Sequence, residues 1–439
     1  MFYSYLIYVQ LNEVMFGYTL VFMESLYRIL KWSEKYTKTD MIYLFKNSFW
    51  VFFGQLVTSA SAFIIMVVLA NVLDKEIFGE YRYLISFISI LLIFTLPGID
   101  TAVIQSTARG YDNQLSLAVA SKKRWALLGS LIALLTAVYY YIQGNSTLTL
   151  SFTIIAACLP FFHTYFVYYY FLQGKQLFRE ATLKQSIGPV LLLLTVSTAA
   201  FYLPYAPLLI LVFLATNVFA HRIGFSLTDR KYKKANQTDD DLIPYGKHLS
   251  LLSVPGIIVN HIDKILIWLV LGAVPTALYS IATIVPLESI RSGRMLAQVA
   301  LPRFAAQKTK PKFKEIFYKL AILFGVLILV WIGYALIAPY IFLILFPGYL
   351  EAIPYSIVSM LIILSIPIYT IRAIFTSHKY KTGLFVSSVI TPPLKTLFLG
   401  TGLIFYGLWG VVIGLVLGSI IETIVNIYLL FRLLSEKVS

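Results

Sequence analysis

Charged side chains are rare in the long apolar stretches of this sequence, and those that occur there are the residues that could do chemistry. An ionised side chain at the centre of a bilayer costs roughly 2.5–3.5 kcal/mol on insertion scales, so it usually faces a partner or a water-filled cavity. His261, Asp263 and Lys264 interrupt one apolar stretch, and Lys395 interrupts another. Lysines at this depth could bind an anion such as a phosphate.

Asp263 and Lys264 are adjacent, so on a helix they point about 100° apart and are not expected to pair face to face. Each should therefore have a partner elsewhere or lie in water. We interpret Lys264 as a phosphate ligand, with Asp263 as its counter-ion or as a cation site. The alternative is an ion pair between helices that holds the bundle together. His261 is a candidate for proton coupling.

Three further charges lie along one stripe of a helix. Glu288, Arg291 and Arg294 are spaced i, i+3 and i+6, and an acid one turn before an arginine favours an intrahelical ion pair. Pairing of Glu288 with Arg291 leaves Arg294 free to reach a ligand, and the planar guanidinium group matches phosphate oxygens. The alternative is that both arginines extend to the cytoplasmic membrane surface.

Four more charged residues lie within apolar stretches. Lys395 follows Pro392-Pro393, where a kink is expected, and we predict that it faces a cavity and binds phosphate. Arg372 is either another phosphate ligand or an anchor at the cytoplasmic membrane surface. Asp100 and Glu422 could each hold a proton or Na⁺, or could neutralise a lysine.

The composition indicates that the solvent of this chain is lipid. Of its 439 residues, 59% are hydrophobic and only 13% are charged, whereas a soluble globular chain is about one quarter charged. The net charge of +15 does not indicate a nucleic-acid partner, because the basic residues occupy short loops between apolar stretches. Loops of this kind stay in the cytoplasm. Lys75 and Arg82 are the exceptions, since they fall on the opposite side.

The apolar stretches predict an all-α membrane protein with about twelve transmembrane helices, since one crossing takes about 20 residues. They lie near residues 46–73, 84–106, 125–143, 148–172, 186–203, 205–226, 249–271, 277–300, 320–338, 353–375, 383–405 and 408–431. The charge asymmetry then places both termini in the cytoplasm. We expect the chain to lie in the cytoplasmic (inner) cell membrane as a multi-pass protein. The short outer loops leave no room for a large catalytic module outside.

The span order predicts four parts of the chain. They are an N-terminal extension with an interfacial helix as one option (1–40), a six-helix lobe (41–227), a cytoplasmic linker (228–248) and a second six-helix lobe (249–435). The stretch from Leu73 to Tyr81 resembles that from Leu271 to Tyr279, and each follows the first span of its half. Such parallel repeats predict two lobes with a cavity between them.

Short stretches of both halves resemble a known family. They are Phe45–Trp50, Gly54-Gln55, Leu69–Leu73, Phe78–Tyr81, Asp263–Ile267, Leu271-Gly272, Tyr279-Ser280 and Gln298–Arg303. Over about residues 41–435 the chain is similar to Wzx-type polysaccharide flippases of the multidrug/oligosaccharidyl-lipid/polysaccharide exporter superfamily. Ala277 departs from the pattern, because a glycine is usual there.

This resemblance implies a V-shaped, two-lobed transporter that is not an enzyme. Its cargo would be a polyisoprenyl-diphosphate-linked oligosaccharide, moved from the inner to the outer leaflet by alternating access. Besides the cargo and the lipid bilayer, polysaccharide polymerase machinery is an expected partner. No cofactor is expected, and coupling to H⁺, Na⁺ or the membrane potential stays open.

Three other functions compete with this one. Within the superfamily they are a flippase for lipid II or another lipid-linked precursor and a multidrug extruder. The buried lysines favour an anionic cargo over a cationic drug. Outside the superfamily, a membrane polysaccharide polymerase or ligase is the alternative, but such enzymes need a sizeable outer loop. No Walker-type glycine loop and no His-Glu-x-x-His motif occurs in the sequence.

Overall fold

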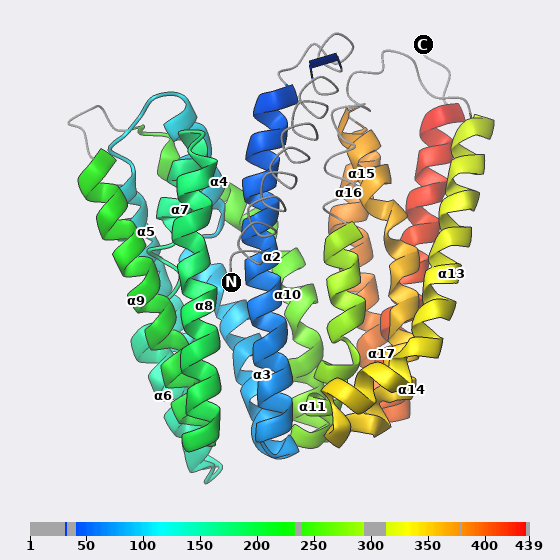
Figure 1. Cartoon of the computed structure of the whole chain (residues 1–439), viewed down its shortest axis with the longest axis horizontal. Helices are drawn as coiled ribbons and strands as arrows, with labels where there is room; N and C mark the ends of the chain where they lie inside the picture. The colour runs from blue at the N-terminus through cyan, green and yellow to red at the C-terminus, as the bar shows by residue number, and fades with distance from the viewer. Residues whose placement is uncertain (1–30, 33–40, 233–238, 294–312, 378–379, 436–439) are drawn as a thin grey trace, which may run out of the picture.

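The computed structural model describes residues 31–32, 41–232, 239–293, 313–377 and 380–435. These residues form helices joined by turns, with no strand among them. Figure 1 shows α5 to α9 as one group of helices and α13 to α17 as another, with α2, α3, α10 and α11 between them. The predicted extension (1–40) lies outside the described residues apart from 31–32.

We call the described helices of the first half of the chain the first lobe. Its elements are α2 (Met41–Val72), α3 (Lys75–Leu91), η1 (Leu92–Thr95), α4 (Gly98–Ala108), α5 (Leu115–Ile142), α6 (Ser146–Cys158), α7 (Val167–Gly174), α8 (Phe178–Tyr202) and α9 (Ala206–Tyr232).

We call the described helices of the second half the second lobe. Its elements are α10 (Leu242–Leu271), α11 (Ala273–Ala282), a further helix (Ile284–Gly293), α13 (Phe313–Leu345), η2 (Pro347–Ala352), α14 (Ile353–Ser359), η3 (Met360–Ser365), α15 (Pro367–Ser377), α16 (Lys381–Phe385), η4 (Val386–Ile390) and α17 (Thr391–Ser435). The element η4 is a π-helix. Because α9 continues to Tyr232 and α10 begins at Leu242, the helices reach into the segment predicted as a linker at both of its ends.

The described helices account for the predicted crossings. Nine are long and apolar enough to span a membrane, or ten when Ala273–Ala282 and Ile284–Gly293 are taken as one bent span. A shorter apolar helix, α6, is continued by α7 after a break. The long stretch that contains α17 holds two antiparallel arms. When α6 with α7 is added as one span and the two arms are counted separately, the ten become twelve candidate spans among the described residues.

Gly407 is where α17 turns back on itself. Its φ of 57° lies in the left-handed region that favours glycine. The two arms then pack closely, because a Cβ on Gly410 would lie 1.8 Å from the carbonyl oxygen of Gly402. Further along, a Cβ on Gly414 would lie 2.4 Å from the carbonyl oxygen of Phe398. Glycines therefore bring the last two spans into backbone contact.

Two of the predicted spans are broken within the first lobe. The second span begins earlier than predicted, at Lys75, and bends where η1 precedes Leu96, whose φ is 53°, and Pro97. The fourth span was predicted as one helix over 148–172, but α6 ends at Cys158 and α7 begins only at Val167. Proline lacks the N–H that a continuing helix needs, which accounts for breaks beside Pro97 and Pro160.

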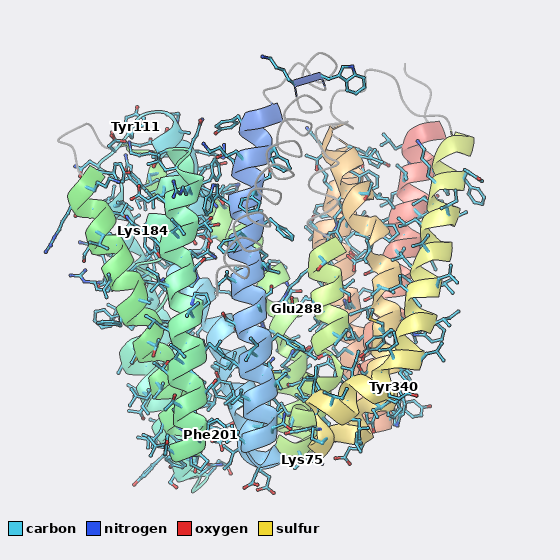
Figure 2. All side chains as sticks on the ribbon, viewed as in Figure 1. Lys75, Tyr111, Lys184, Phe201, Glu288 and Tyr340 are labelled. Atoms are coloured by element: carbon cyan, nitrogen blue, oxygen red, sulfur yellow. The ribbon has the colours of Figure 1, made fainter. Side chains whose placement is uncertain are left out.

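The outer surface of the bundle is apolar. On α13, for example, Leu329, Leu336 and Tyr340 each keep about two thirds of their surface exposed, at 68%, 69% and 67%. Large contiguous apolar surfaces on a soluble protein would cause association, so this face is built for lipid. Figure 2 places Lys75 and Phe201 at one end of the molecule, Tyr111 at the other, and Glu288 between them. We call these the Lys75 end and the Tyr111 end.

Candidate functional site

Asp263 and Lys264 are buried in α10 and form an ion pair with each other. The Lys264 Nζ atom lies 3.2 Å from Oδ2 of Asp263, and the Lys264 backbone N–H donates to Oδ1 at 2.8 Å. The prediction that adjacent residues would not pair was therefore wrong. The lysine side chain is long enough to bend back to the carboxylate of the preceding residue. Tyr279 of α11 completes the group by donating its hydroxyl to Asp263 Oδ2 at 2.9 Å.

Arg82 of α3 brings a cation from the first lobe to this pair. Its charge interacts with those of Asp263 and Arg291, and it also acts on Lys264 and His261. The Nε atom of Arg82 is buried and has no hydrogen-bond partner within the described part of the chain. A buried donor of this kind normally finds a partner, so Arg82 is a candidate ligand for an anion.

Glu288 and Arg291 form the predicted intrahelical ion pair on the helix Ile284–Gly293. This pair is open, because 58% of the Arg291 side chain and 33% of the Glu288 side chain are exposed. Figure 2 shows Glu288 about halfway between the two ends of the molecule. Arg294, predicted as a phosphate ligand, lies outside the described residues.

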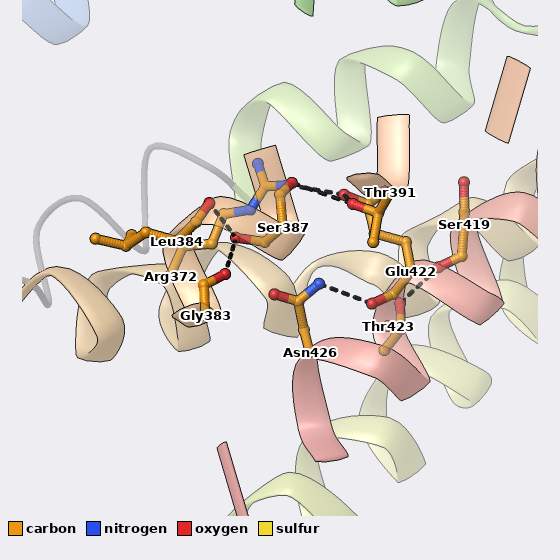
Figure 3. Close-up of polar contacts among 9 residues, drawn as sticks. All are labelled: Arg372, Gly383, Leu384, Ser387, Thr391, Ser419, Glu422, Thr423 and Asn426. Carbon is orange, nitrogen blue, oxygen red and sulfur yellow. Dashed lines mark hydrogen bonds and ion pairs between the residues drawn. The ribbon is translucent and has the colours of Figure 1, made fainter. Parts of the chain in front are cut away.

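Arg372 and Glu422 form a second, half-buried arrangement, shown in Figure 3. The Arg372 Nη2 atom lies 2.8 Å from Glu422 Oε1 and also donates to the backbone carbonyl of Ser387. Ser387 belongs to the π-helix η4, a type of wide helical turn that is frequent at functional sites. Thr391 donates to the same Glu422 oxygen at 3.3 Å. The π-helix therefore helps to hold the guanidinium group against the carboxylate.

Lys395 lies between these two groups on the first arm of α17. Its side chain packs on the second arm, since a Cβ on Gly418 would lie 2.8 Å from its Cγ. The charge of Lys395 interacts with those of Glu422, Asp263 and Arg372. No acid among the described residues forms an ion pair with it. Lys395 is therefore a half-buried cation placed near two carboxylates that already have other partners.

These residues form one connected group, which we call the central charge cluster. It comprises Arg82, His261, Asp263, Lys264, Glu288, Arg291, Arg372, Lys395 and Glu422. Five cations face three carboxylates, so with neutral histidine its formal charge is positive. Both lobes contribute to it. Every carboxylate in the cluster is the counter-ion of a cation, which was one of the alternatives that the sequence left open.

Asp100, the remaining predicted acid, lies elsewhere. It pairs with Lys122 of α5, the Nζ and Oδ1 atoms being 2.5 Å apart. The two side chains are 9% and 0% exposed, so the pair is sealed inside the first lobe. Asp100 therefore neutralises a lysine, as one of its alternatives predicted.

The sequence did not single out Arg82, Lys122 and Tyr279 as site residues. Arg82 could have been found from the sequence, because a cation on the side opposite the basic loops is an exception to the positive-inside rule. Lys122 belongs to the basic run Lys122–Arg124, and the positive-inside rule accounts for such a run without any site. Tyr279 had no signal beyond its place in the repeat, since tyrosines are common in this chain.

Comparison with protein families gives one match that covers most of the chain. The family described as "Polysaccharide biosynthesis protein" matches residues 44–306. No curated protein matches the sequence.

Solved structures with the same fold include transporters of two kinds. The lipid II flippase MurJ in an inward closed conformation has a TM-score of 0.64 at 14% identity, covering 89% of this chain and 87% of its own. An inward-facing multidrug resistance MATE family transporter of the MOP superfamily has a TM-score of 0.63 at 12% identity, with 86% and 94% covered. A Pyrococcus furiosus MOP superfamily transporter, described as having a binding pocket of reverse polarity, has a TM-score of 0.54 at 12% identity, with 90% and 95% covered.

Proposed function

This chain belongs to the polysaccharide biosynthesis protein family, and from that premise we propose that it flips a polyisoprenyl-diphosphate-linked oligosaccharide across the cytoplasmic membrane. The fold is that of the multidrug/oligosaccharidyl-lipid/polysaccharide exporter superfamily. The observation that carries the proposed cargo is the central charge cluster, which has an excess of cations halfway through the bundle.

The cluster suits a diphosphate because its cations can exchange partners. A buried cation without any partner is costly, and Lys264, Arg291 and Arg372 each have a carboxylate as ion-pair partner. When a diphosphate enters, Lys395 and Arg291 meet it first, since Lys395 has no ion-pair partner among the described residues and Arg291 is exposed. Guanidinium groups such as that of Arg372 can then form bidentate hydrogen bonds to phosphate oxygens.

The two-lobed fold supports alternating access. Arg82 comes from the first lobe and the other cations from the second, so a bound anion would bring the lobes together. The hydrated glycan would follow the diphosphate between the lobes, while the polyisoprenyl chain stays in the lipid. Coupling to H⁺, Na⁺ or the membrane potential would act at the carboxylates, because protonation of Asp263 or Glu422 releases a cation.

We take transport to run from the inner to the outer leaflet, with both termini in the cytoplasm. The support is the positive-inside rule, since nearly all of the 35 lysine and arginine residues fall on one side of the predicted spans. Polysaccharide polymerase machinery at the outer leaflet would then receive the cargo.

Deletion of the gene followed by lipid extraction tests the proposal. We expect a polyisoprenyl-diphosphate oligosaccharide to accumulate in the inner leaflet and surface glycan to be lost. Re-expression of the wild type or of Lys319→Met, an exposed control on α13, should reverse both effects, and Lys395→Met should not. Normal surface glycan without accumulated precursor, in a strain that has no second flippase, would contradict the proposal. Accumulation of lipid II instead would identify a different cargo.

A further inference from the structure

Lys75 is a cation on the side of the membrane where the positive-inside rule does not expect one. The structure gives it a partner, because its ammonium group forms an ion pair with Glu351. It also lies over the ring of Tyr349, with Nζ 5.4 Å from the ring centroid. Lys75 begins α3 in the first lobe, whereas both partners belong to η2 in the second. The charge therefore joins the lobes at the Lys75 end.

Other contacts at the same end also cross between the lobes. Asn71 donates its amide to the backbone carbonyl of Leu345, which ends α13, at 2.8 Å. Phe78 meets Tyr349 edge to face, their ring centroids 6.0 Å apart, and both residues are almost fully buried. One of these contacts is thus polar, and the other is a buried contact between two aromatic rings.

Gly79 shows how closely the lobes approach here. A Cβ added at this position would lie 2.0 Å from the carbonyl oxygen of Ala273, at the start of α11. A distance below 3.0 Å does not occur for a real Cβ, and the obstacle is backbone rather than a flexible side chain. Any larger residue at Gly79 must therefore push α3 and α11 apart.

We propose that these contacts form a latch that holds the two lobes closed at the Lys75 end and that must open once in each transport cycle. The latch consists of Asn71, Lys75, Phe78 and Gly79 on the first lobe with Ala273, Leu345, Tyr349 and Glu351 on the second. Its closure would block approach to the central charge cluster from the Lys75 end. The latch does not depend on the identity of the cargo. That the Lys75 end faces the outside of the cell rests on the orientation given under the proposed function.

The parts of the latch differ in strength. The ion pair is exposed, at 36% for Lys75 and 55% for Glu351, and exposed pairs change an equilibrium by only about 1.5- to 5-fold. The buried aromatic contact and the glycine contact must therefore supply most of the closure. Neutralising Glu351 alone should shift the balance slightly toward the open state, and a wedge at Gly79 should shift it strongly.

Cross-linking tests the requirement for opening. In a Cys158→Ala background, which removes the sole cysteine, Lys75→Cys and Glu351→Cys are joined by a short thiol-specific cross-linker that contains a disulfide. We expect transport to stop when the cross-link forms and to return when a reductant cleaves it. Each single cysteine variant, treated identically, should keep its transport. Undiminished transport by fully cross-linked protein would overturn the proposal.

Labelling tests the closed state without any transport assay. A cysteine placed at Glu288, halfway through the molecule, is treated with a membrane-impermeant thiol reagent from either side of the membrane. We expect Gly79→Leu to raise labelling from the Lys75 end at least about five-fold. Gly348→Leu at the same end is the control, because a Cβ there meets nothing within 4 Å, and it should leave labelling unchanged.

Labelling from each side of the membrane distinguishes a wrong orientation from a wrong latch. Increased labelling by Gly79→Leu from the cytoplasmic side alone would keep the latch but reverse the proposed orientation. No increase from either side, with Gly79→Leu present in the membrane in normal amounts, would overturn the latch. If Gly79→Leu fails to fold, Glu351→Lys, which places two cations opposite each other, takes its place with the same expected direction.

Discussion

Two groups of charged residues differ in how their charges are satisfied: the Asp100–Lys122 pair of the first lobe and the group that Lys395 forms with Arg372 and Glu422 in the second. In the first lobe, Asp100 and Lys122 form a sealed pair with side chains 9% and 0% exposed. In the second lobe, Lys395 has no ion-pair partner among the described residues, and Arg372 and Glu422 remain 30% and 15% exposed. Charges of the first kind are satisfied by each other. Charges of the second kind remain able to bind a ligand that enters and leaves during transport.

This difference separates structural charge from functional charge. Breaking a sealed pair leaves a lone buried ion and destabilises the fold. Removing a charge from an open group costs little stability, since its partners can be solvated, but it removes a ligand contact. The predictions below test whether the two groups follow these two rules.

The largest effect is expected at the sealed pair. Lys122→Met leaves Asp100 as an uncompensated buried charge, which should lower the free energy of unfolding by about 3–5 kcal/mol. Thermal unfolding in detergent measures this loss. The double variant Asp100→Leu/Lys122→Met should recover most of the stability and also transport. A stable double variant that no longer transports would give the first-lobe pair a functional role and so break the comparison.

The next effect is expected at Arg82. Arg82→Gln removes the first-lobe cation from the central charge cluster, and a hydrogen bond to a charged group is worth about 1.5–3 kcal/mol. Transport per molecule should fall about 10- to 100-fold, with unchanged unfolding temperature. Arg222→Gln, which removes an arginine that lies over Tyr165 away from the cluster, is the matched control. Equal losses in both variants would argue against a special role for Arg82.

The hairpin of α17 should show an intermediate effect on stability. Gly410→Val forces a side chain into the backbone of Gly402, and overpacking of this kind costs about 1–3 kcal/mol. Gly400→Val, at a site where a Cβ meets nothing within 4 Å, should cost much less. The two unfolding temperatures, measured side by side, check this. Similar values would mean that the close packing of the arms does not hold Lys395 and Glu422 in place.

The smallest effect is expected at Glu288. Its pair with Arg291 is exposed, and exposed ion pairs contribute about 0.2–1 kcal/mol. Glu288→Gln should therefore leave stability unchanged and alter the rate of transport less than about five-fold. A complete loss of transport in this variant would show that Glu288 has a role beyond that of a counter-ion.

The sequence predicted the fold well because hydropathy and loop charge decide it. In lipid, every backbone N–H and C=O group must find its hydrogen-bond partner within the protein. Each long apolar stretch therefore forms a helix, and the helices match the predicted spans in order. The breaks near Pro97 and Pro160 were not located, because proline within a membrane helix is compatible with either a kink or a break.

The site was predicted as a set of residues but not as a set of contacts. Lys264, Lys395, Arg291, Arg372 and their acids do gather in one cluster. The pairing of Asp263 with Lys264 was missed because helix geometry at the Cα positions ignores the length of a lysine side chain. The pairing of Arg372 with Glu422 depends on a π-helix and on the packing of α15 against α17. Neither the π-helix nor this packing can be recognised from a pattern in the sequence.

The charge of the cargo provides the most direct test of the central claim, that the central charge cluster binds a diphosphate on its way across the membrane. Purified protein in liposomes would be given two fluorescent polyisoprenyl oligosaccharides that differ only in the diphosphate, and flipping would be followed by loss of fluorescence after an impermeant quencher is added. We predict that the wild type flips the diphosphate lipid much faster than the uncharged one, and that Lys395→Met abolishes this preference. Equal flipping of both lipids by the wild type would contradict the account.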